Sequence, residues 1–408
     1  MTLYCELLSI IVNEISDVVN YRRWGEETMN IAIWGAGKFG LYVGRQLIGR
    51  QNIICYIDNH SEGIEDVLGI KVVSPVEYAD CYSQKVDIVL VAVWDYNEIY
   101  EQLCRMEVKN FGLMGRLIYQ WRLEISDDIL NDINIVYHTD LRHKKGFMKK
   151  LETNVVDFCN LNCKGCSHFS NLFPTGAAIG YESFEKDIMH LSKEIFIEHF
   201  DLLGGEAFLS ERLADYIGCL RRYMPKTTIT VVSNGTLIPR QSPELLSYIR
   251  QNQVLVSITE YPPTSKLRNE IISTLEKHGI LYEFRKVAET FGKNIDLTGK
   301  NDPYKAQTEC RESRCHFLRN GKIYKCPFSA LGGHFFEQYG IPLHFEEGVD
   351  IYDESIDLAQ ALKCLDAEPI ELCKYCGKEE RFVWAVSNRP ECSEWIVKDN
   401  DSAGFAHL

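Results

Sequence analysis

The chain has 408 residues, 45% of them hydrophobic and 25% charged, which is typical of a folded protein with two or three domains. Its 58 acidic and 44 basic residues give a formal net charge of −14, which argues against a nucleic-acid partner. No segment approaches the run of about 20 apolar residues that spans a membrane, and no basic region precedes the first apolar residues as in a secretion signal. We therefore expect a cytoplasmic protein without a membrane span.

Residues 1–28 are the first predicted element. Apolar residues recur at helical spacing between positions 3 and 19, which predicts an amphipathic helix. Its apolar face can pack on its own domain or form a dimer contact. The pattern leaves both open, and with them the oligomeric state.

Residues 29–120 have the pattern of a Rossmann-like, nucleotide-binding type of domain. An apolar strand at 31–34 leads into a glycine-rich turn and a helix, and the glycines Gly35, Gly37 and Gly40 allow a tight turn, approach of a phosphate and close helix packing. A second strand ends at Asp58, where an acid meets a ribose hydroxyl in such folds. The predicted ligand is NAD or a nucleotide sugar, and the alternative is a related fold used for docking or substrate shape.

Residues 121–150 are charged and irregular, and we interpret them as a connector. Its basic run at 143–145 is a solvated face or a contact for an anionic substrate. From 151 to 300, strands alternate with amphipathic helices, which is typical of an α/β protein whose parallel sheet curls into a barrel or part of one. The strands are expected at 153–158, 200–203, 228–232, 254–258 and 281–285. The helices are expected at 183–197, 209–223 and 264–278.

The loop after the first of these strands contains three closely spaced cysteines, Cys159, Cys163 and Cys166. Three thiolates on one loop can hold three irons of a 4Fe-4S cluster and leave the fourth iron open for chemistry. A zinc site closed by His168 is the alternative. Many cysteines in a chain expected to stay in a reducing compartment favour metal or redox chemistry over disulfides.

This Cys-x3-Cys-x2-Cys loop resembles that of the radical S-adenosylmethionine (SAM) enzymes. The resemblance implies a partial (β/α)6 barrel, a 4Fe-4S cluster on the three cysteines and SAM bound to the fourth iron. In that family one electron, supplied by a flavodoxin or ferredoxin, cleaves SAM to methionine and a 5'-deoxyadenosyl radical that takes hydrogen from the substrate. Gly165 departs from the family, in which an aromatic residue often precedes the last cysteine.

The loops after the second and third strands match positions that contact SAM in the family. The run Gly204-Gly205-Glu206 resembles the motif at the methionine end of SAM, where glycines admit the ligand and a carboxylate accepts hydrogen bonds from its ammonium. An ordinary strand-to-helix turn is the alternative. Ser233 and Asn234 match contacts to the carboxylate and ribose of SAM, or else form a helix cap.

Glu260 and Tyr261 follow the fourth strand. On the family's pattern they face the same cavity, where a carboxylate or phenol can relay a proton or a hydrogen atom. The alternative is a packed rim.

Residues 301–408 form a cysteine-rich region. Asn320-Gly321 predicts a two-residue hairpin turn, and in that register Cys315 lies opposite Cys326, with β carbons about 5 Å apart. Together with Cys373 and Cys376, these residues offer four thiolates for a closed 4Fe-4S cluster or a zinc ion.

This region resembles the auxiliary-cluster extension of radical SAM enzymes that is known as SPASM, or twitch in its shortened form. Gly321 and Cys326 match its Gly-x4-Cys element, and the leading cysteine is either Cys315 or Cys310. We expect one auxiliary cluster, although Cys310, Cys364 and Cys392 leave a second one open. One of these three is alternatively a free thiol that donates a hydrogen atom, as in some family members, and Cys310 is our candidate.

The sequence therefore predicts a radical SAM enzyme with a small-molecule substrate. An auxiliary cluster that accepts an electron would give dehydrogenation, and a thiol or tyrosine that returns hydrogen would give epimerisation. A sugar or nucleotide sugar is the favoured substrate, because the N-terminal domain looks similar to those of some sugar-modifying enzymes. Modification of a ribosomal peptide is the second hypothesis, and a non-catalytic iron–sulfur redox sensor is the third.

Overall fold

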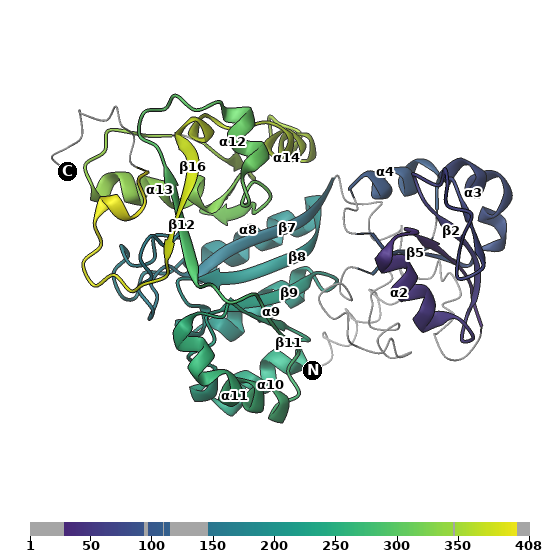
Figure 1. Cartoon of the computed structure of the whole chain (residues 1–408), viewed down its shortest axis with the longest axis horizontal. Coiled ribbons are helices and arrows are strands. Elements are labelled where there is room, and N and C mark those ends of the chain that lie inside the picture. The colour runs from purple at the N-terminus through teal and green to yellow at the C-terminus, as the bar shows by residue number, and fades with distance from the viewer. Residues whose placement is uncertain (1–27, 94–96, 109, 115–145, 346, 398–408) are drawn as a thin grey trace, which may run out of the picture. The chain divides into compact units, whose positions relative to one another are not determined.

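The computed structural model describes residues 28–93, 97–108, 110–114, 146–345 and 347–397 (Figure 1). The chain divides into two compact units, Met1–Asp140 and Leu141–Leu408. The predicted N-terminal helix, the connector up to residue 145 and its basic run lie outside the described residues. Within the described ranges, no helix has both the length and the apolar character that crossing a bilayer requires.

The N-terminal unit contains a six-stranded sheet in the order β3-β4-β2-β1-β5-β6. Neighbouring strands are parallel except β3 and β4, so the Rossmann-like prediction is confirmed. Strand β5 is apolar and buried throughout, and so is β1 after its first residue, Asn30, as expected of parallel strands covered on both faces. The strands are β1 Asn30–Trp34, β2 Asn52–Ile57, β3 Asp66–Val67, β4 Ile70–Val73, β5 Ile88–Val91 and β6 Phe111–Leu113. The helices are α2 Lys38–Leu47, α3 Pro75–Cys81, η1 Ser83–Lys85 and α4 Asn97–Arg105.

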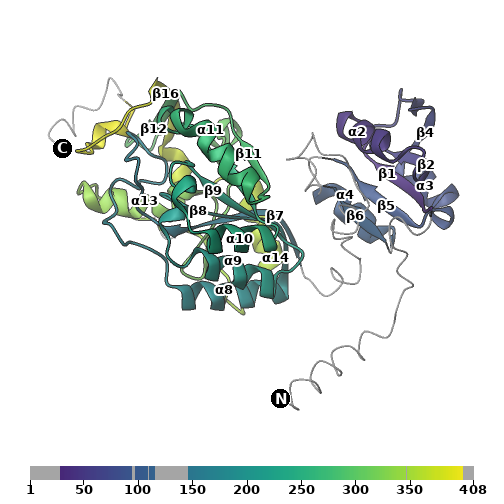
Figure 2. The same cartoon turned by 90° about the horizontal axis from the view of Figure 1, so that it is seen from below.

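The second unit is built on an eight-stranded sheet in the order β11-β10-β9-β8-β7-β13-β14-β15. Its first five strands in the chain are parallel neighbours, which confirms the predicted partial barrel. Figure 2 shows the helices α8, α9 and α10 side by side along this sheet. The parallel strands are β7 Gly146–Val156, β8 Ile195–Gly204, β9 Thr228–Ser233, β10 Leu255–Ile258 and β11 Tyr282–Phe284. The helices of this part are α8 Tyr181–Glu194, η2 Ala207–Leu209, α9 Leu213–Tyr223, η3 Ile238–Arg240, α10 Pro243–Gln251 and α11 Pro262–Lys277.

Two of these strands differ from the prediction. Strand β7 begins at Gly146, inside the predicted connector. Lys150, one of the charged residues that suggested a connector, lies on this strand and pairs there with Glu152. Strand β8 begins at Ile195, where a helix was predicted to continue. Its apolar residues Ile195 and Ile197 fit the helical spacing of the preceding segment, but all of β8 except its last residue is buried, so a parallel strand satisfies them equally well.

The cysteine-rich region is continuous with the barrel sheet, and both lie in the compact unit Leu141–Leu408. The predicted hairpin is present, with Phe317 opposite Tyr324, but β13 also pairs with β7 and extends the barrel sheet. Strand β12, which precedes residue 301, pairs with β16 near the end of the chain. The strands are β12 Thr290–Ile295, β13 Phe317–Arg319, β14 Lys322–Tyr324, β15 Val349–Asp350 and β16 Cys376–Val383. The helices are α12 Pro303–Glu309, α13 Pro327–Gln338, α14 Leu358–Ala367, η4 Glu371–Tyr375 and η5 Cys392–Glu394.

A buried aromatic core joins the cysteine loop to this C-terminal region. Phe169, three residues after Cys166, packs against Phe335 and Trp395 with ring centroids 5.2 and 5.9 Å apart. Trp395 also donates its indole N–H to the carbonyl of Cys166 at 2.8 Å. The C-terminal region therefore positions the loop that carries the three cysteines.

Candidate active site

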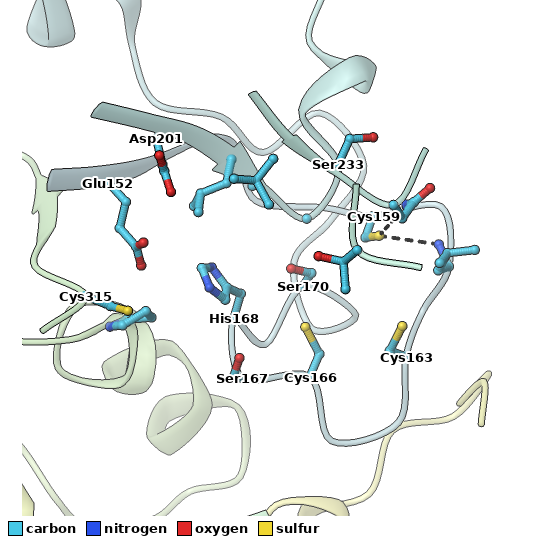
Figure 3. A pocket seen from close by; sticks show the side chains of 18 of the residues that line it. Glu152, Cys159, Cys163, Cys166, Ser167, His168, Ser170, Asp201, Ser233 and Cys315 are labelled. Carbon is cyan, nitrogen blue, oxygen red and sulfur yellow. Dashed lines mark hydrogen bonds between the residues drawn. The ribbon is translucent and has the colours of Figure 1, made fainter. Parts of the chain in front are cut away.

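The loops after β7, β8, β9 and β10 surround one cavity of about 260 Å³. Figure 3 shows Cys159, Cys163 and Cys166 along one side of it. The residues that motif analysis placed there and that do line it are Cys159, Cys163, Cys166, Gly204, Gly205, Ser233, Asn234 and Tyr261. They come together because the carboxyl ends of parallel strands meet at one edge of the sheet.

Backbone and side-chain N–H groups surround the sulfur atoms of the cysteine loop. The backbone N–H of Leu161 lies 3.4 Å from Cys159 Sγ, and the indole N–H of Trp384 lies 3.2 Å from Cys163 Sγ. Metal-bound thiolates accept such bonds, which tune a cluster. Gly165 has φ +61°, and a Cβ there would lie 2.7 Å from the carbonyl oxygen of Glu394, so this site needs glycine where the family often has an aromatic residue.

The chemistry of the loop fits an iron–sulfur cluster. Burial, with a smaller contribution from the neighbouring thiols, raises the pKa of Cys159 and of Cys163 to about 12, so binding an iron cation in place of the protons relieves this cost. His168, which would close a zinc site, has Nδ1 3.0 Å from Asn154 Oδ1, and burial lowers its pKa to about 4. Within the described residues, no three His, Cys, Asp or Glu side chains are already grouped to hold a single metal ion.

The Gly-Gly-Glu turn packs against the cysteine loop and hydrogen-bonds to the loop after β9. A Cβ on Gly205 would lie 2.1 Å from the carbonyl oxygen of Phe158, so the glycines allow the turn to pack against the start of the cysteine loop. The side chain of Glu206 is 1% exposed and accepts hydrogen bonds from Ser233 Oγ at 2.7 Å and from the backbone N–H of Asn234 at 2.8 Å. Glu206 therefore braces the loop after β9 and is not among the residues that line the cavity.

Ser233 and Asn234 both line the cavity and are held in place. Besides its bond to Glu206, Ser233 Oγ accepts from the backbone N–H of Gly235 at 2.8 Å. The side-chain amide of Asn234 donates to Asn160 Oδ1 at 2.9 Å and lies 3.8 Å from Cys159 Sγ. Asn234 therefore couples the loop after β9 to the cysteine loop, which is where a ligand bound to the cluster would lie.

Of the two predicted relay residues, Tyr261 lines the cavity and Glu260 does not. The carboxylate of Glu260 is buried against Arg268 and accepts from Ser265 Oγ at 2.9 Å. The sequence placed both at the mouth because they are adjacent, but adjacent residues point in different directions. Tyr261 packs near Trp384, with ring centroids 5.9 Å apart, and burial raises its pKa well above the ordinary value.

Of the two candidate leading cysteines of the auxiliary site, Cys310 lies in a cavity with other cysteines of that site. Cys310, Cys326 and Cys376 line a second cavity of about 670 Å³. Burial raises the pKa of Cys376, and the thiols of Cys326, Cys373 and Cys310 and the carboxyl of Glu312 add to this shift. The paired strands end at Phe317 and Tyr324, short of Cys315 and Cys326, so the placement of these two cysteines opposite each other stays a prediction.

Cys315 lies instead in the first cavity, together with charged residues that motif analysis missed. Burial raises its pKa to about 12, and the next contribution comes from Glu152. The missed residues are Lys150, Glu152, Asp201, Arg285 and Glu312. A signal was available in the sequence for two of them, since Asp201 and Arg285 fall within predicted barrel strands, whose residues alternate between the interior and the exterior.

In the N-terminal unit, Trp34, Asp58, Val93 and four further residues line a cavity of about 420 Å³ where β1, β2 and β5 end. Gly35 has φ +118°, and a Cβ on Gly40 would lie 1.8 Å from the carbonyl oxygen of Gly35, as expected of the tight turn and the close helix packing. Asp58 Oδ2 accepts from the backbone N–H of Ala36 at 2.8 Å, so this carboxylate braces the glycine loop as well as lining the cavity.

A comparison with protein families agrees with the prediction of an iron–sulfur cluster on the cysteine loop. Residues 151–274 match the family model of a 4Fe-4S single cluster domain. No curated protein matches the chain. The prediction of a 4Fe-4S domain in the barrel is therefore confirmed.

Several solved structures share a partial likeness with the chain. One is native anSMEcpe with bound AdoMet and the Cp18Cys peptide, at 18% identity and a TM-score of 0.28, over 34% of this chain and 42% of that chain. Another is BtrN in complex with AdoMet and 2-DOIA, at 15% identity and a TM-score of 0.34, over 57% of this chain and 93% of that chain. SuiB from Streptococcus suis bound to S-adenosylmethionine matches at 11% identity and a TM-score of 0.29, over 69% of this chain and 84% of that chain. The chain thus spans less than half of the first of these proteins.

The partial barrel and the matched segment define an iron–sulfur domain. The Cys-x3-Cys-x2-Cys loop after β7 and the Gly-Gly turn after β8 line one cavity of this domain.

Proposed function

We propose that this protein is a radical SAM enzyme that removes hydrogen from a sugar or a nucleotide sugar. The observation that supports this proposal is that the cysteine loop, the Gly-Gly turn and the Ser233-Asn234 pair line one cavity. When bound there, a 4Fe-4S cluster and SAM supply a 5'-deoxyadenosyl radical that abstracts hydrogen. The three cysteines hold the cluster, Gly204 and Gly205 leave room for the methionine part of SAM, and Ser233 and Asn234 offer polar groups to its carboxylate and ribose.

Dehydrogenation is the outcome that we favour. A closed cluster on Cys310, Cys326, Cys373 and Cys376 would accept the second electron of the substrate. We call the cavity that the cysteine loop lines the SAM cavity, and the one that Cys310, Cys326 and Cys376 line the auxiliary cavity. Ser167 and Glu312 line both, so the two cavities adjoin at these side chains. A substrate in the first cavity would therefore lie close to an electron acceptor in the second.

The position of Cys315 supports epimerisation as a second candidate. Its thiol lines the SAM cavity and is not part of the auxiliary cluster of cysteines. A thiol there could return a hydrogen atom to a substrate radical, and Tyr261 could do the same. Incorporation of deuterium from D₂O into the substrate would favour epimerisation, and loss of two hydrogens would favour dehydrogenation.

The polar lining supports a sugar over an apolar substrate. Three acids and two bases face the cavity, together with Ser167 and Ser170. Peptide modification is the alternative, and a precursor peptide encoded beside the gene would favour it. We further propose a flavodoxin or ferredoxin as electron donor, and NAD or a nucleotide sugar as ligand of the N-terminal unit.

The test is anaerobic reconstitution with iron and sulfide, followed by incubation with SAM and dithionite and chromatography for 5'-deoxyadenosine. Wild type is expected to form 5'-deoxyadenosine, and the triple variant C159A/C163A/C166A is expected to form none. Cys81→Ala is the matched control, because Cys81 is an exposed cysteine outside the barrel. Absence of 5'-deoxyadenosine from wild type with a full complement of iron would reject the proposal and favour a redox sensor. Stoichiometric zinc on the three cysteines would reject it as well.

A further inference from the structure

The SAM cavity contains a buried ionic cluster on the side away from the three cysteines (Figure 3). Lys150 Nζ lies 3.0 Å from Glu152 Oε2 and 2.9 Å from Asp201 Oδ2. Glu152 on β7 is the register partner of Asp201 on β8, and residues 150 and 152 share one face of their strand. The cluster is therefore held by the barrel itself and not by a loop.

The cluster carries more negative than positive charge. Glu152 and Asp201 are 3% and 5% exposed, and one ammonium, that of Lys150, lies between their carboxylates. Arg285 and Glu312 also line the cavity and add one formal charge of each sign, but burial raises the pKa of Glu312 to about 7, so the negative excess at neutral pH is less than one charge. An uncompensated buried carboxylate is unfavourable, and a cationic ligand would relieve the cost. Burial raises the pKa of Glu152 although Lys150 opposes the shift, which is consistent with this excess.

A second observation also indicates a ligand in this cavity. Ser170 is 2% exposed and lines the cavity, yet its hydroxyl has no hydrogen-bond partner. A buried hydroxyl without a partner is rare in folded proteins, because its desolvation is not compensated. A ligand hydroxyl within the cavity would supply the missing bond.

The ionic cluster lies deeper in the barrel than the groups assigned to SAM. Asp201 precedes Gly204 by three residues on β8, a rise of about 10 Å along the strand. The amino group of SAM belongs at the cysteine end on the proposed assignment, so it cannot compensate the carboxylates at the other end. The compensating cation must come from the substrate.

We propose that Glu152 and Asp201 bind the amino group of the substrate, which is an amino sugar or a closely related amine-bearing polyol. The ammonium donates to the two carboxylates while Lys150 keeps them in place, and Ser170 bonds a ring hydroxyl. This inference rests on the proposed function, since it assigns the substrate end of the same cavity. It narrows the substrate class from sugars in general to sugars that carry a positive charge.

The test compares matched sugars that differ in one group. Calorimetry measures binding of D-glucosamine and D-glucose, and of their 1-phosphates, to anaerobically reconstituted enzyme loaded with SAM. At neutral pH, wild type is expected to bind the amino sugar of at least one pair at least ten-fold more tightly than its hydroxyl counterpart. Glu152→Gln and Asp201→Asn are expected to reduce this preference to less than two-fold, because each replaces a charged acceptor with a neutral one of similar shape.

Controls separate this inference from the proposed function. Glu182→Gln is the matched control, since the Glu182 side chain is 83% exposed on α8 and pairs with Arg212. Iron content and circular dichroism establish that the Glu152 and Asp201 variants fold. Formation of 5'-deoxyadenosine by wild type is measured on the same samples, and its absence counts against the proposed function alone.

Three results would overturn the inference while leaving the radical SAM chemistry intact. The first is equal binding, or no binding, of both members of each pair. The second is a preference for the amine that survives both substitutions. The third is tighter binding of Nα-acetyl-lysinamide than of either amino sugar, which would indicate a peptide substrate.

Discussion

Replacing Cys310 and Cys315 separately tests which of them belongs to the auxiliary cluster. Cys310 shares a cavity with Cys326 and Cys376, whereas Cys315 lines the SAM cavity beside Glu152. We therefore expect Cys310→Ala to impair the auxiliary cluster and Cys315→Ala to leave it assembled. The two cysteines are only five positions apart in the chain, so their different roles are a consequence of the fold.

The expected difference is large enough to measure by iron and sulfide analysis. Two 4Fe-4S clusters correspond to about eight irons per chain, and loss of one leaves about four. Reconstituted Cys315→Ala is expected to contain about eight, like wild type and the control Cys81→Ala, and Cys310→Ala about four to five. Electron paramagnetic resonance of the dithionite-reduced samples provides a second measurement, because the signal of the auxiliary cluster is expected to vanish in Cys310→Ala.

Equal iron content in the two variants would contradict this assignment. A loss of iron in Cys315→Ala with full iron in Cys310→Ala would contradict it as well. That result would support Cys315, opposite Cys326 on the hairpin, as the cluster ligand. Both variants must retain the SAM-binding cluster for the comparison to hold, and 5'-deoxyadenosine formation without substrate reports on that cluster.

Other substitutions test single contacts. Arg319→Ala removes a guanidinium that bonds both carboxylate oxygens of Asp157, at 2.7 and 2.8 Å, and Asp157 is 1% exposed. Loss of such a partner costs about 3–5 kcal/mol, so the melting temperature should fall by roughly 6 °C or more, and a fall under 2 °C would reject this account. Gly40→Ala should lower the stability of the N-terminal unit by about 1–3 kcal/mol in denaturant unfolding, because its Cβ would clash with Gly35, and unchanged stability would argue against that close packing. Glu260→Gln should leave 5'-deoxyadenosine formation within two-fold of wild type, and a ten-fold loss would return Glu260 to the catalytic residues.

Local sequence patterns were sufficient to predict much of the fold of this protein. The strand–glycine–helix run around Gly35 predicted the Rossmann-like unit, because both turn chemistry and apolar spacing are properties of short segments. The cysteine spacing at 159–166 predicted the cluster loop for the same reason. Alternation of strands and helices then placed the four loops at one end of a barrel, since parallel strands leave little choice of topology.

Direction of side chains was decided by the tertiary structure. The motif positions predicted Glu206 as a contact of SAM and Glu260 as a relay residue. In the structure, each carboxylate turns toward a neighbouring loop or helix and accepts hydrogen bonds there. Cys315 and Cys310 are equivalent in a one-dimensional pattern, and their assignment depends on where the hairpin stops pairing. The charged cluster on β7 and β8 requires the register between two strands that are far apart in the chain. Sequence by itself determines which groups are available, whereas the packing of distant segments determines which of them reach the same cavity.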